Sequence, residues 1–104
     1  MSAVPQPTFN EKGVIVQHHE GAAPTVDQDR IELRSDLGDE MNWTCDHPGK
    51  RFRVTFVGRS PFASSTFNEV NYRSGPIVSG ATGEYKYSVE IDGKINDPKV
   101  IIQP

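Results

Sequence analysis

The side chains best suited to chemistry are three histidines and one cysteine, His18, His19, His47 and Cys45. Imidazole and thiolate groups are the ligands that zinc and copper favour in proteins. Neighbouring residues of an extended chain point to opposite faces, which separates His18 from His19, and the spacing of Cys45 and His47 matches no common zinc pattern. We therefore expect no built metal site. If the protein does bind a metal, its function is expected to be copper or zinc handling through His18, His19 and His47, and this is the alternative to the protein-binding function considered below.

A hydrolytic centre is the second chemistry to consider, because Cys45, Asp46 and His47 include a nucleophile, a base and a carboxylate. The members of such triads come together from distant segments, and three residues crowded into one turn seldom align. We expect the protein not to be an enzyme. Cys45 is expected to be a small buried residue on the same strand face as Trp43.

The segment 58–83 is the best candidate for contact with a partner protein. It is rich in Ser, Gly and Pro, its apolar residues are isolated, and loops held by a rigid sheet commonly carry binding function. Guanidinium groups bind planar anionic groups, and aromatic side chains anchor many interfaces. We predict partner contacts from Arg59, Phe62, Phe67 and Tyr72. In the competing interpretation, these aromatic residues close the open end of a sandwich.

The elements that would position these residues are β-strands, because apolar and polar residues alternate and no stretch shows a helical repeat. Trp43 is expected at the centre of the core, and Asp92-Gly93 predicts a two-residue hairpin turn. The segment 20–29 is expected to be a loop. The expected strands are 13–18, 30–34, 40–45, 50–57, 84–91 and 99–103, with one or two short strands inside 58–83.

The order of these strands resembles that of the cupredoxin family, and within this family it is most similar to the plastocyanin-like domain. The resemblance rests on the segments EMNWTCD (40–46), RFRVTF (51–56), YKYSV (85–89) and VII (100–102). It implies an all-β fold, a single Greek-key sandwich of about seven strands. In that family a histidine before the second of these strands and a cysteine in the third bind copper, followed by a further histidine and usually a methionine.

Carried over position by position, the resemblance places the first histidine near Phe52 and the cysteine near Val89, and neither side chain can bind copper. No His, Met or Cys follows between residues 90 and 104. A type-1 copper centre needs two imidazoles and a thiolate. The resemblance therefore implies a cupredoxin-like scaffold without a copper site, without electron transfer and without a cofactor.

The length and the net charge of the chain limit the number of domains and the classes of partner that we expect. The 104 residues are the length of one domain, which we expect to consist of an extended arm over 1–12 and a sandwich over 13–104. A net charge of −3 disfavours nucleic acid and anionic membranes, and the acidic loop residues are expected to be solvated turn formers: Asp27, Asp29, Asp36, Asp39 and Glu40. Arg51 and Arg53 on one strand are expected to be a solvated face, with an acidic partner as the alternative.

A cytoplasmic location is expected, because the N-terminal residues do not have the pattern of a signal peptide and the single cysteine cannot form an intramolecular disulfide. Together these observations favour a non-catalytic protein-binding or assembly module. The expected partner is another protein or a second copy of the chain, with neither nucleic acid nor membrane involved.

Overall fold

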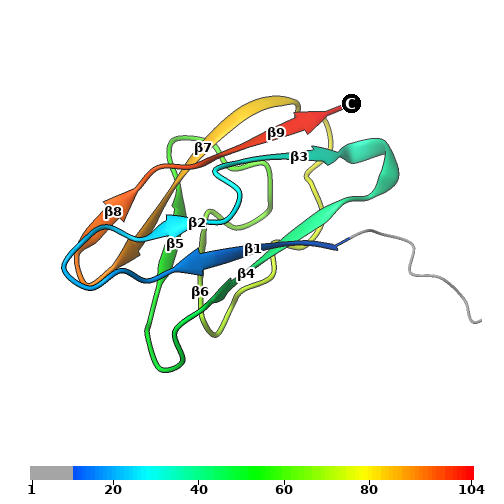
Figure 1. Cartoon of the computed structure of the whole chain (residues 1–104). Coiled ribbons are helices and arrows are strands. Elements are labelled where there is room, and N and C mark those ends of the chain that lie inside the picture. The colour runs from blue at the N-terminus through cyan, green and yellow to red at the C-terminus, as the bar shows by residue number, and fades with distance from the viewer. Residues whose placement is uncertain (1–10) are drawn as a thin grey trace, which may run out of the picture.

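Residues 11–104, the part of the chain that the computed structural model describes, contain nine β-strands and one turn of 3-10 helix (Figure 1). Residues 1–10 of the predicted arm lie outside the described residues, and the arm's last two residues, Glu11 and Lys12, belong to the first strand. The elements are β1 (Glu11–Gln17), β2 (Thr25–Val26), β3 (Arg30–Arg34), η1 (Ser35–Leu37), β4 (Glu40–Cys45), β5 (Arg53–Phe56), β6 (Thr66–Asn68), β7 (Gly83–Ile91), β8 (Lys94–Asn96) and β9 (Lys99–Gln103).

The strands form two sheets, so the prediction of an all-β fold is confirmed. One sheet has the order β2-β1-β4, and the other has the order β3-β9-β7-β5-β6 with β8 added beside β7. Both sheets are mixed, because β1 runs parallel to β4 and β3 runs parallel to β9. The expected count of about seven strands was too low. The segment 20–29, predicted as a loop, contains β2, which is only two residues long and too short to show a readable alternation.

The core lies between the sheets and follows the predicted alternation. Val14 and Val16 of β1, Met41 and Trp43 of β4, and the inward residues of the other sheet are buried in one continuous cluster. Trp43 occupies its centre, stacked on the Phe67 ring with 4.9 Å between ring centroids. Aromatic pairs at such distances add to the stabilisation from burial alone. The prediction that Trp43 forms the centre of the core is confirmed.

The hairpin predicted at Asp92-Gly93 is present between β7 and β8. Ile91 pairs with Lys94, which leaves two residues in the turn. Both turn residues have positive φ, 53° at Asp92 and 79° at Gly93, as a type I′ turn requires. Glycine meets this requirement without a steric cost. The preceding expected strand, 50–57, begins later than predicted, at Arg53.

Part of the long segment between β5 and β7 runs along the outer edge of β4. The Trp43 N–H donates to the Tyr72 carbonyl at 3.0 Å, and the Ser74 N–H donates to the Met41 carbonyl at 2.8 Å. The Ser74 hydroxyl also accepts the Met41 N–H at 2.9 Å. Together with β6 and a bridge between Phe62 and Ile77, this pairing gives the segment more order than its composition indicates.

Asp39 corrects the expectation that the acidic loop residues are all solvated. It is only 1% exposed, and its carboxylate accepts the Arg34 N–H at 2.8 Å. Lys12 of β1 lies 3.6 Å from the same carboxylate oxygen and also donates to the Glu32 carbonyl at 3.0 Å. The outer edge of β3 is therefore occupied by side chains from β1 and from the turn after η1, which blocks further strand pairing there.

Candidate functional site

The four predicted partner-binding residues do not form one surface. Phe62 and Phe67 are 3% and 1% exposed and belong to the core, so their rings are not accessible to a partner. Arg59 is exposed and lies over the ring of Tyr85, with 5.9 Å from its guanidinium carbon to the ring centroid. Tyr72 is 37% exposed and lies elsewhere, against the end of β4.

Tyr72 borders a surface hollow of about 320 Å³ that we call the β4-edge hollow. It lies between the end of β4, the turn that follows this strand, and the segment that precedes Ser74. Its mixed walls include the apolar faces of Trp43, Cys45, Pro48, Phe52 and Tyr72, and the remaining lining residues are Thr44, His47, Gly49, Lys50 and Glu69. A hollow of this size is at the lower end of small-ligand sites and fits one large side chain.

The backbone of β4 is open where it borders this hollow. Along a strand, alternate residues direct their N–H and C=O groups to opposite edges, and Met41, Trp43 and Cys45 direct theirs away from β1. Tyr72 and Ser74 satisfy groups of Met41 and Trp43, and then the neighbouring chain turns away. Within residues 11–104, no hydrogen bond reaches the Cys45 N–H or the Trp43 carbonyl.

Charged groups at the rim of the hollow are already engaged within the protein. The Lys50 ammonium donates to the Asp92 carboxylate at 2.8 Å, a contact that lowers the pKa of Asp92 and raises the pKa of Lys50. The Glu69 carboxylate accepts the Phe52 N–H at 3.2 Å. The groups left over at the hollow are therefore apolar surface, open backbone, the Thr44 hydroxyl and the His47 imidazole.

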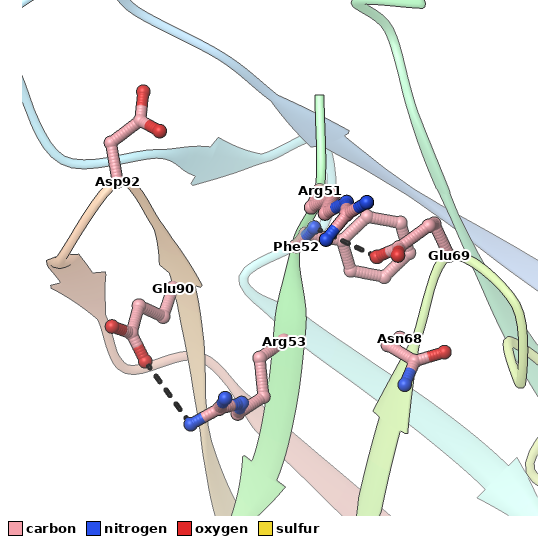
Figure 2. Close-up of a pocket in the computed structure, with 7 residues that line it drawn as sticks. All are labelled: Arg51, Phe52, Arg53, Asn68, Glu69, Glu90 and Asp92. Carbon is pink, nitrogen blue, oxygen red and sulfur yellow. Dashed lines mark hydrogen bonds and ion pairs between the residues drawn. The ribbon is translucent and has the colours of Figure 1, made fainter. Parts of the chain in front are cut away.

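A second hollow of about 310 Å³ lies across the outer face of β5 (Figure 2). Arg51 and Arg53 both line it, as the alternation of the strand predicts. Arg53 lies 4.0 Å from the Glu90 carboxylate, and Glu69 and Asp92 also line the hollow. Acidic side chains thus surround the two arginines, and this mixture of charges gives no cationic surface for an acidic partner.

The structure brings two of the three histidines together. The rings of His18 and His47 lie 5.0 Å apart between centroids at an interplanar angle of 57°. His19 faces elsewhere and shares a 2.7 Å hydrogen bond with the Thr25 hydroxyl. Among residues 11–104, no group of three or more His, Cys, Asp and Glu side chains is arranged to hold a metal ion. The sequence could not reveal the histidine pair, because it depends on the parallel pairing of β1 with β4.

The positions that the cupredoxin resemblance assigns to copper ligands hold buried apolar side chains. Phe52 is 3% exposed, Val89 is fully buried, and both belong to the core cluster. Neither side chain has a lone pair to donate, and both pack in the core cluster. The residues present therefore do not fit a type-1 copper ion.

Comparisons with known proteins identify no relative of this chain. No family model matches the sequence, and neither a curated protein nor a solved structure is significantly similar to it. No helix within the described residues is long and apolar enough to cross a membrane. A function for this chain therefore has to come from its own geometry.

Proposed function

We propose that this chain is a non-catalytic protein-binding module, a cupredoxin-like Greek-key scaffold that lacks the type-1 copper ligands and works in the cytoplasm. Its binding site is the β4-edge hollow. The observation that carries the proposal is the open backbone of Trp43 and Cys45 directly beside apolar walls. An unpaired strand edge next to an apolar recess is the arrangement that many domains use to bind extended peptides.

The occupant is a short segment of a partner protein with one aromatic or large aliphatic side chain. That side chain fills the hollow against the Tyr72 ring, while a backbone carbonyl of the partner accepts the Cys45 N–H. The pairing of β4 with Tyr72 and Ser74 is thereby extended by one more step. Because Lys50 and Glu69 are engaged with groups of their own protein, a charged small molecule finds no free counter-charge there.

Selection from a displayed library of short peptides tests this proposal. Selected peptides are expected to share one aromatic or large aliphatic position, and fluorescence anisotropy then gives their affinity for the purified chain. Tyr72→Ala removes a ring that borders the hollow and is expected to weaken binding about tenfold, as loss of an interface anchor does. Val57→Ala is the matched control, because Val57 is an exposed apolar residue outside the hollow.

Cys45→Pro provides a second variant, because proline removes the open N–H without removing a hydrogen bond of the folded protein. Circular dichroism confirms that the variant is folded, and peptide binding is expected to weaken. The proposal is wrong if the selected peptides bind wild type, Tyr72→Ala and Cys45→Pro equally well, or if the library yields no binder. Light scattering identifies the case in which the partner is a second copy, through a mass of twice 11.5 kDa.

A further inference from the structure

We propose that His18 and His47 form a binding site for one divalent transition-metal ion, with Glu20 as its third protein ligand. This inference goes beyond the protein-binding function and does not depend on it. It differs from the type-1 copper position of the resembled family, where Phe52 and Val89 leave no ligand. The observation that carries it is the contact between two imidazoles from separate strand ends, 5.0 Å apart between ring centroids.

The fold explains why these two residues meet. The parallel register pairs Val16 with Cys45, and continuing it by two residues along each chain places residue 18 beside residue 47. The Asp46 carboxylate accepts the His18 N–H at 3.0 Å, which ties the end of β1 to the turn after β4. The backbones that carry both imidazoles are therefore fixed relative to each other before any ion binds, which reduces the entropy cost of binding.

A third ligand is close enough to complete the site. The Glu20 carboxylate lies 3.4 Å from Nε2 of His18, and its side chain is 96% exposed, whereas the side chain of His18 is only 8% exposed. An exposed carboxylate can move toward an ion at little cost, while the less exposed imidazole is held in place. No three ligands are preorganised within the described chain, so the ion gathers Glu20 on binding and water fills its remaining positions.

The surrounding charge favours a cation. Two carboxylates lie beside His18: that of Glu20, 3.4 Å from Nε2, and that of Asp46, which accepts the His18 N–H, while the Lys50 ammonium is paired with Asp92. A divalent ion at the imidazoles adds favourable interactions with the carboxylates left over.

The ligand types define the class of ion. Imidazole suits zinc, copper and nickel, whereas calcium and magnesium require several oxygen ligands. Affinity for nitrogen ligands rises toward copper in the divalent series, so Cu²⁺ is expected to bind more tightly than Zn²⁺. Magnesium is expected not to bind.

Calorimetric titration of the full chain with Zn²⁺ tests the proposal, since zinc does not oxidise the Cys45 thiol. One equivalent is expected to bind, and His18→Ala and His47→Ala are each expected to weaken binding at least about tenfold. His19→Ala is the matched control, a neighbouring histidine bonded to Thr25, and is expected to change affinity by less than about threefold. His18→Ala is the more selective variant, because His47 also lines the β4-edge hollow.

Electron paramagnetic resonance with Cu²⁺, on the Cys45→Ser variant to prevent thiol oxidation, gives a second measurement. Hyperfine splitting from two imidazole nitrogens is expected, and it is expected to fall to one in the His18→Ala form of this variant. The proposal is overturned if zinc does not bind, if all three histidine variants bind alike, or if Cys45→Ser alone abolishes zinc binding. Equal affinity for magnesium would overturn it as well.

Discussion

At the scale of single residues, the core contains two buried polar atoms whose hydrogen-bonding capacity is not used. The indole nitrogen of Trp43 and the hydroxyl of Tyr87 have no hydrogen-bond partner among the described residues. Their rings meet edge to face, 5.7 Å apart between centroids. An unsatisfied buried polar group costs free energy, so removing the Tyr87 hydroxyl while keeping its ring should not destabilise the protein.

Tyr87→Phe is therefore expected to leave the free energy of unfolding unchanged or to raise it by about 1 kcal/mol, because the variant no longer buries an unpaired hydroxyl. Tyr85→Phe is the control, since the Tyr85 hydroxyl accepts a long hydrogen bond of 3.5 Å from Arg59. Urea denaturation measures both. A loss of more than about 1 kcal/mol in Tyr87→Phe would show that the hydroxyl has a partner after all.

The same hydroxyl predicts how stability depends on alkaline pH. Burial raises the pKa of Tyr87 from 10.0 to about 12. Since the pKa is higher in the folded state, the stabilisation is complete below pH 10 and is lost as the pH rises from about 10 to about 12. Two pKa units correspond to about 3 kcal/mol. Denaturation across this window should show a shallower pH dependence in Tyr87→Phe than in wild type, and identical slopes would contradict the assignment.

Asp39 is a second residue with a measurable role. Asp39→Ala is expected to destabilise the fold by about 2 kcal/mol, because it removes the buried carboxylate that accepts the Arg34 N–H and forms an ion pair with the more exposed Lys12. Asp36→Ala, at an exposed site three residues earlier, is the control and is expected to have little effect on stability. Thermal unfolding compares the two. Equal melting temperatures for both variants would mean that the buried carboxylate contributes nothing.

At the scale of elements, the edges of the strands determine where a partner can bind. The edge of β3 is blocked by Lys12 and Asp39, whereas the edge of β4 is covered only as far as Tyr72. Exposed edges are the sites where strands of other chains add. The difference between these two edges explains why the proposed site lies beside Cys45 and not at the edge of β3.

Ser74→Ala tests how the covered part of this edge is held. The Ser74 hydroxyl accepts the Met41 N–H and donates to the Gly75 carbonyl, so its loss leaves a buried N–H unpaired and is expected to cost about 1 to 2 kcal/mol. Hydrogen exchange at Met41 should accelerate accordingly. Ser79→Ala, in an exposed part of the same segment, is the control. Unchanged exchange at Met41 would mean that the hydroxyl does not hold the edge.

Sequence patterns predicted the elements whose stability is local. The alternation in β3, β4 and β7 and the Asp92-Gly93 turn were correct because each pattern depends on residues close in the chain. Strand β2 was missed because two residues carry no period. The burial of Asp39, the histidine pair and the β4-edge hollow could not be predicted, since each depends on contacts between distant segments. Isolated aromatic residues such as Phe62 and Phe67 are ambiguous in a sequence, because core and interface use the same side chains.

At the scale of the whole molecule, both proposed binding sites, the β4-edge hollow and the histidine pair, lie at the same end of the sandwich. The end of β4 and the turn after it contribute Cys45 to the hollow and His47 to both the hollow and the histidine pair. The Lys50–Asp92 ion pair links this turn to the β7–β8 hairpin of the other sheet. The two sheets are thus joined beside the proposed site, which gives a partner a rigid surface on which to bind.

Residue-resolved hydrogen exchange along β4, with and without a selected peptide, tests the open strand edge most directly. In the free protein the Trp43 amide, bonded to the Tyr72 carbonyl, is expected to exchange slowly and the Cys45 amide quickly. On adding peptide, the Cys45 amide is expected to become protected while Trp43 changes little. Protection of Cys45 already in the free protein, or peptide-induced protection confined to other strands, would contradict the proposed mode of binding.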